Sequence, residues 1–187
     1  MSINWSRQIE LTRPDIVGDA PSNLVEAKTK LKQYLAQREI RRENLKNVLM
    51  DNRVPFGNSK SEIVLMTEFF LKAVAEDTTI DGFSNQFVDF LWNFGQFIGD
   101  LAIDMAPAGV NRWKVENKAI KGCSPQYAFV VYGYALESQS FEPDSYLIAS
   151  AFAKKAGREA KSDFVVGKLN YILALANKRR LQSVRIL

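Results

Sequence analysis

Apolar residues recur every three or four positions along most of this chain, which is the spacing of helices with one buried face. The first such stretch follows Pro21 and the N-cap candidate Ser22, and it extends to Asn52. Its apolar positions are Leu24, Ala27, Leu31, Leu35, Leu45, Val48 and Leu49. One unbroken helix here would be about 46 Å long. A break near Gln37 is an equally good interpretation, because three arginines interrupt the apolar stripe just after it.

Two further helices are predicted in the middle of the chain. The first covers residues 60–76, follows a turn at residues 54–58, and has Ser59 or Ser61 as its N-cap. Caps of this kind satisfy backbone N–H groups that the first turn leaves without partners.

The second covers residues 84–105 and is apolar nearly all round, which is typical of a helix at the centre of a fold. Its Gly95 and Gly99 are four residues apart, and in a soluble helix this spacing favours the close approach of another element. We therefore expect this helix to be the one around which the others pack.

From residue 110 the pattern changes from helical to alternating. Residues 112–116 alternate like a short strand, and residues 127–134 are rich in aromatic and β-branched side chains. A turn is expected at residues 122–125. An antiparallel β element is therefore predicted near residues 110–136.

Helical spacing returns in the tail, where helices are predicted from Pro143 to about Gly157 and from a Ser162 cap to about Lys178. The predicted fold class is mainly α (α+β), with five to six helices and a small antiparallel β element. The prediction is one globular domain over residues 1–187, with irregular ends at residues 1–20 and 179–187.

Composition changes this picture mainly through what it lacks. The chain contains no His and a single Cys, Cys123. Ser-His-Asp and Cys-His catalysis in their usual forms and His-ligated zinc are therefore excluded, and one thiol cannot form an intrachain disulfide or a thiolate metal site. Acid–base chemistry would have to use Asp, Glu, Lys, Tyr or Cys123. We predict no catalytic residue, no metal site and no cofactor.

The chain also carries no pattern that predicts contact with a membrane. Its N-terminus lacks the basic-then-apolar layout of a signal peptide. The longest apolar region is interrupted by Asp89, Asn93, Gln96, Asp100 and Asp104. We therefore expect a cytoplasmic protein without a membrane partner.

The candidate site for a protein partner lies around the end of the central helix. Asp100 and Asp104 share one helix face, a geometry that could hold a divalent cation or share a proton. Further ligands are lacking, so ion pairing with Arg112 or Lys114, or simple exposure, is the favoured interpretation. Trp113 stands between those two cations and is either a partner-binding anchor or a core residue that caps the helix.

Nucleic acid is the alternative partner, because the net charge is +4 and the pI about 9.1. The candidate residues for this alternative are Arg38, Arg41, Arg42, Lys154, Lys155 and Arg158. These side chains could meet phosphates. The competing interpretation is a solvated helix face with ion pairs, together with cations that are favoured near helix C-termini.

Residues 94–101, Phe-Gly-Gln-Phe-Ile-Gly-Asp-Leu, precede Pro107 and the stretch Val-Asn-Arg-Trp-Lys-Val at residues 110–115. Over Phe87–Val131 this arrangement resembles small uncharacterised bacterial proteins, some of which are immunity or accessory proteins beside toxins. The resemblance implies an α+β helical domain that acts by binding, and it supplies no catalytic residue. We therefore expect a non-catalytic protein-binding protein, with nucleic-acid binding and an Asp/Glu/Lys-based enzyme as the other hypotheses. The oligomeric state stays open.

Overall fold

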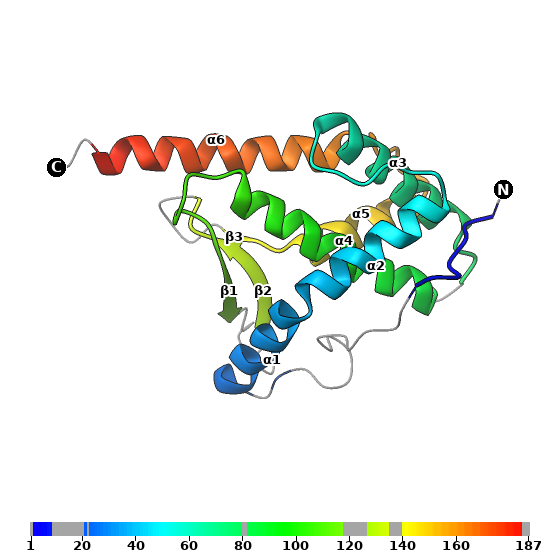
Figure 1. The fold of residues 1–187 in the computed structure, drawn as a ribbon, viewed down its shortest axis with the longest axis horizontal. Coiled ribbons are helices and arrows are strands. Elements are labelled where there is room, and N and C mark those ends of the chain that lie inside the picture. Colours follow the sequence, from blue (N-terminus) through cyan, green and yellow to red (C-terminus); the bar gives the residue numbers. More distant parts are fainter. Residues whose placement is uncertain are drawn as a thin grey trace.

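The computed structural model describes residues 2–8, 21, 23–79, 82–117, 127–134 and 140–184, except for the side chains of Asn117 and of residues 179–184. The helices are α1 (Leu24–Ala36), α2 (Arg38–Asp51), α3 (Lys60–Glu76), α4 (Asn85–Asp104), α5 (Pro143–Lys155) and α6 (Phe164–Val184), and the strands are β1 (Arg112–Asn117), β2 (Tyr127–Tyr132) and β3 (Ser140–Phe141). The predicted class, mainly α with a small antiparallel element, is confirmed (Figure 1). The predicted cap Ser22, the turn at residues 122–125 and Cys123 lie outside the described residues.

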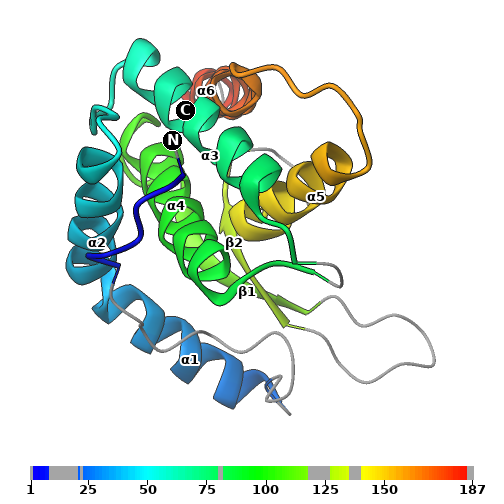
Figure 2. The same cartoon turned by 90° about the vertical axis from the view of Figure 1, so that its right-hand side faces the viewer.

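The long helical stretch at the start of the chain is divided into two helices, which confirms the interpretation with a break near Gln37. Gln37 separates α1 from α2, with φ −89° and ψ 4° in place of α-helical values. The Asn23 side chain caps α1 by accepting a hydrogen bond from the Glu26 N–H at 3.0 Å. Figure 2 shows that the two helices meet at an angle.

The second predicted helix begins with a reciprocal cap. The Ser59 side chain accepts from the Glu62 N–H, and the Glu62 carboxylate accepts from the Ser59 N–H at 2.9 Å. Ser59 is therefore the N-cap residue of α3. The Ser59 and Glu62 side chains together satisfy two backbone N–H groups at the start of the helix.

The central position predicted for the helix over residues 84–105 is confirmed by α4. Its side chains are buried on nearly all sides, and α2, α3, α5 and α6 pack around it (Figure 2). The largest core side chains include Phe70 from α3 and Phe87, Phe90 and Phe94 from α4. Among the described helices, none combines the length and hydropathy needed to cross a bilayer.

Two glycines let neighbouring elements approach α4 closely. A Cβ at Gly95 would collide with the Asp144 carboxylate, and a Cβ at Gly99 would collide with the Trp113 indole and lie 3.2 Å from Pro143 Cγ. The packing interpretation of this glycine pair is therefore confirmed.

The sheet has the order β1-β2-β3, with Trp113 opposite Val131 and Val115 opposite Phe129. β3 lies just beyond the predicted limit at residue 136. One face of the β1–β2 pair packs on α1, where a second and smaller hydrophobic cluster forms. Its buried members are Ala27, Leu31, Tyr34, Trp92, Val115 and Phe129.

The structure corrects two predictions about the tail. α6 begins at Phe164 and the Asp163 carbonyl accepts its first hydrogen bond, from the Gly167 N–H at 2.8 Å, so Ser162 is not at the cap position. The helix continues through Val184, so the irregular end predicted from residue 179 is helical that far. No Gly or Pro occurs between Lys178 and Val184 to end it.

Candidate functional site

Two outward side chains of β1, Arg112 and Lys114, form a cationic patch at the edge of the described sheet, and the third, Glu116, accepts a hydrogen bond from the Ser140 hydroxyl. Arg112 and Lys114 are both exposed and alternate with the inward Trp113 and Val115. The Lys114 ammonium lies 4.2 Å from the centre of the Tyr132 ring, and Arg112 is opposite Tyr132 in the strand register. A cation over an aromatic face is attracted by the ring quadrupole. We call Arg112, Lys114 and Tyr132 the β1 patch.

Trp113 joins β1 to α4 on the other face of the strand. Its indole N–H donates to Asp100 Oδ1 at 2.9 Å, and its ring meets the Tyr34 ring edge-on at a centroid distance of 5.9 Å. The side chain is half-buried and packs against both hydrophobic clusters. Trp113 thus has a packing role whatever else it contacts.

Asp100 is paired, but not with the cations that the sequence suggested. Its Oδ2 lies 2.9 Å from the Nε of Arg38, the first residue of α2, and neither Arg112 nor Lys114 takes that place. Burial raises the pKa of Asp100, and the bonds from Trp113 and Arg38 act in the opposite direction. Arg38 was missed because 62 positions separate it from Asp100 and only the fold brings them together.

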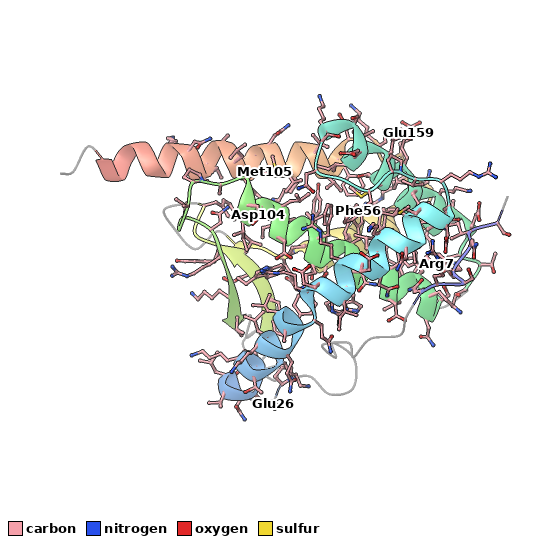
Figure 3. The ribbon with its side chains drawn as sticks, in the orientation of Figure 1. Arg7, Glu26, Phe56, Asp104, Met105 and Glu159 are labelled. Carbon is pink, nitrogen blue, oxygen red and sulfur yellow. The ribbon has the colours of Figure 1, made fainter. Side chains whose placement is uncertain are left out.

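Asp104 is exposed at the C-terminal end of α4, beside Met105 (Figure 3). Its charge also raises the pKa of Asp100. In the part of the chain that the structure describes, no three side chains of metal-binding type come together. The pair Asp100 and Asp104 therefore has no third ligand of that kind among the described residues.

Arg41, a candidate phosphate contact, lies inside the molecule with 2% of its surface exposed. Its guanidinium donates to Asn93 Oδ1 at 3.2 Å and to Gln37 Oε1 at 3.0 Å, and it lies 5.1 Å from the centre of the Tyr34 ring. Burial lowers the pKa of Arg41, and Tyr34 raises it. Its assignment to a nucleic-acid surface is therefore wrong, because α2 turns this position inward, toward α4.

A second buried charged residue, Asp144, escaped the sequence analysis. It is the second residue of α5, is 2% exposed, and its Oδ1 has no hydrogen-bond partner. Burial raises the pKa of Asp144 well above its usual range, Glu142 adds to the rise, and Arg41 opposes it. An Asp after Pro is an ordinary helix start, and only the glycine spacing on α4 gave a signal that something packs there.

The other basic candidates divide into engaged and exposed side chains. The Arg42 guanidinium lies 5.6 Å and 5.7 Å from the ring centres of Phe56 and Phe97. Lys154 is partly exposed and Arg158 is exposed on the end of α5 and the loop after it. Lys154 and Arg158 are therefore accessible to an anionic partner.

Lys155 fastens the loop between α3 and α4. Its ammonium donates to the carbonyls of Thr79 at 2.9 Å and Gly82 at 2.6 Å, and it lies 3.5 Å from Asp77 Oδ1. Asp77 in turn accepts from the N–H and the hydroxyl of Ser84 at 2.8 Å and 2.7 Å. Lys155 therefore holds the loop between α3 and α4 against α5.

We expect Asp77 to make the protein sensitive to acid. Burial raises the pKa of Asp77, but the hydrogen bonds from Ser84 and Thr79 outweigh it and leave the pKa at about 2. A lowered pKa stabilises the folded state above the unfolded value of about 3.9, and this contribution is lost as the pH falls through about 2. Asp77→Asn should lower the free energy of unfolding at pH 7 by about 2 kcal/mol and flatten its decline between pH 4 and 2.

Denaturant unfolding at a series of pH values measures this effect. The matched control is Glu68→Gln, which removes an acid from an exposed position of α3. A wild-type slope retained in Asp77→Asn would contradict the assignment of this acid sensitivity to Asp77.

The arrangement divides the candidate groups into two kinds. Arg41 and Asp144 are buried where neighbouring helices pack on α4, so they act within the fold. The β1 patch faces outward and can meet another molecule. Comparison with protein-family models, curated proteins and solved structures finds no match to this chain.

Proposed function

We propose that this chain is a non-catalytic binding protein and that the β1 patch recognises an acidic segment of a protein partner. The observation that carries the proposal is the contact between Lys114, on the edge strand β1, and the Tyr132 ring of the neighbouring strand β2. Edge strands offer backbone groups that a second chain can pair with, and alternate side chains then select the partner. Arg and Tyr are also enriched where binding energy concentrates.

The biological setting that we propose is the neutralisation of a bacterial toxin or a related accessory role. The resemblance over Phe87–Val131 motivates this setting, and β1 lies within that range. The net charge of +4 favours an acidic partner, because charge complementarity speeds association and selects among partners.

The test compares two double variants that change the net charge equally. Arg112→Glu/Lys114→Glu reverses the β1 patch, and Lys154→Glu/Arg158→Glu reverses exposed or partly exposed cations at the end of α5. Each tagged protein is used to capture partners from native lysate, with and without nuclease, and the partner found is then titrated. We expect the first variant to weaken binding at least tenfold, about 1.4 kcal/mol, and the second to bind like wild type.

Recovery that collapses with nuclease, or that only the second variant loses, would contradict the proposal and favour a nucleic acid on the α5 side. Thermal unfolding of both variants controls for folding. The β1 patch is exposed, so neither variant should shift the melting temperature by more than a few degrees.

A further inference from the structure

The boundary between α1 and α2 does not coincide with a helix-breaking residue. Neither Gly nor Pro occurs anywhere between Leu24 and Asp51, and the residues around the break, Ala36 to Glu39, include strong helix formers. Sharp helix breaks normally coincide with Pro, Gly or an inserted group. A single helix through Gln37 would therefore be favoured if only local propensity acted.

Tertiary contacts of α1 hold the bend instead. Leu31 and Tyr34 pack on Trp92, Val115 and Phe129 in a hydrophobic cluster separate from the main core. Gln96 Nε2 also donates to the Tyr34 carbonyl at 3.3 Å. The Arg38–Asp100 ion pair holds the first residue of α2 against α4. α1 is thus a helix docked onto α4 and the β1–β2 pair through this cluster, with a hinge at Gln37.

We propose that Gln37 is the hinge of a domain exchange, in which α1 and α2 join into one helix and α1 docks on the sheet of a second copy of this chain. When α1 leaves, the surface formed by Trp92, Val115 and Phe129 is uncovered. The α1 helix of a second copy fits this surface, because its Leu31 and Tyr34 restore the same contacts. Closed exchange between two identical chains loses none of these contacts, and the joined helix gains the backbone bonds interrupted at Gln37.

The chain before α1 is long enough to permit this exchange. A helix over residues 24–51 would be about 42 Å long at 1.5 Å per residue. The segment before α1 is anchored near the far end of α2, since the Asn4 N–H donates to Asn52 Oδ1 at 2.8 Å and Arg7 pairs with Asp51. Residues 9–23 separate the two points in the sequence, and an extended chain of this length reaches about 50 Å.

The experiment measures oligomeric state in hinge variants by light scattering after gel filtration over a range of concentrations. Gln37→Ala raises the helix propensity of the hinge and Gln37→Gly lowers it. The difference in helix propensity between Ala and Gly changes the equilibrium constant for helix formation about fivefold at each hinge. Because each dimer contains two hinges, the dimer dissociation constants of the two variants should differ about 25-fold. Gln33→Ala, the same change at an exposed position of α1, is the matched control and should behave like wild type.

Mixed-label cross-linking identifies the dimer. Light protein and ¹⁵N-labelled protein are unfolded together, refolded, and treated with an amine cross-linker whose spacer is long enough to reach from Lys32 of α1 to Lys114 on the outer face of β1. We expect the isolated dimer to give pairs with one light and one heavy peptide. Purely light–light and heavy–heavy pairs in a dimer, or a monomer at every concentration in Gln37→Ala, would each overturn the proposal.

Discussion

Replacing Gly99 by alanine should lower the free energy of unfolding by about 2–3 kcal/mol, although the same change usually stabilises a helix. The new Cβ would collide with the Trp113 indole and lie 3.2 Å from Pro143 Cγ. The indole cannot easily move away, since its N–H is bonded to Asp100 and its ring contacts Tyr34. The expected sign is therefore opposite to the one that helix propensity predicts.

Denaturant unfolding measures this effect, and α6 offers a matched control. Gly167 is also helical and exposed, and a Cβ there would meet nothing within 4 Å, so Gly167→Ala should stabilise the protein by up to about 1 kcal/mol. Trp113→Phe shortens the ring system and should reduce the penalty of Gly99→Ala when the two are combined. Equal effects of Gly99→Ala and Gly167→Ala would show that Trp113 does not restrict this helix position.

Replacing Asp144 by asparagine should stabilise the protein at pH 8 by about 2 kcal/mol, because it removes an enclosed carboxylate and nearly keeps its shape. Asp144 is 2% exposed, and burial raises its pKa well above the usual range. A raised pKa means that the folded state binds a proton that the unfolded state has released. The contribution of Asp144 to stability should therefore be greatest below its unfolded pKa of about 3.9 and be lost as the pH rises through the folded pKa.

The pH dependence of unfolding tests this assignment. Asp144→Asn should lose the decline in stability that this group is expected to cause as the pH rises above about 3.9, while Asp163→Asn, at an exposed Asp before α6, should keep it. The contribution of Asp77 has the opposite sign and lies at acidic pH, so the two are separable in one series. If the decline above about pH 3.9 is unchanged in Asp144→Asn, another group causes it.

Local patterns in the sequence were enough to place most elements. The apolar stripes mark α3 and α4, the Ser59 cap marks the start of α3, and the alternation at residues 112–116 marks β1. These signals are reliable because helix and strand bonds join residues close in sequence, so the residues that decide them stand a few positions apart.

The candidate site was only partly predictable. Trp113 and Asp100 were both named from the sequence, and the structure brings them together at 2.9 Å. Three features were not predicted from the sequence. They are the ion pair of Arg38 with Asp100, the burial of Arg41, and the hydrogen bonds from Lys155 to the carbonyls of Thr79 and Gly82. Each depends on a neighbour tens of positions away, about which residue spacing carries no information.

The sequence by itself therefore determined a mainly helical chain around an aromatic helix, with a small antiparallel sheet and without histidine chemistry. Only the tertiary structure decided which charges lie inside, whether α1 breaks from α2 at Gln37, and which face of β1 is open. The reason is physical: a periodic pattern says that a face is buried but not against what. The Gln37 bend and the Asp144 carboxylate beside Gly95 exist only because distant elements pack there.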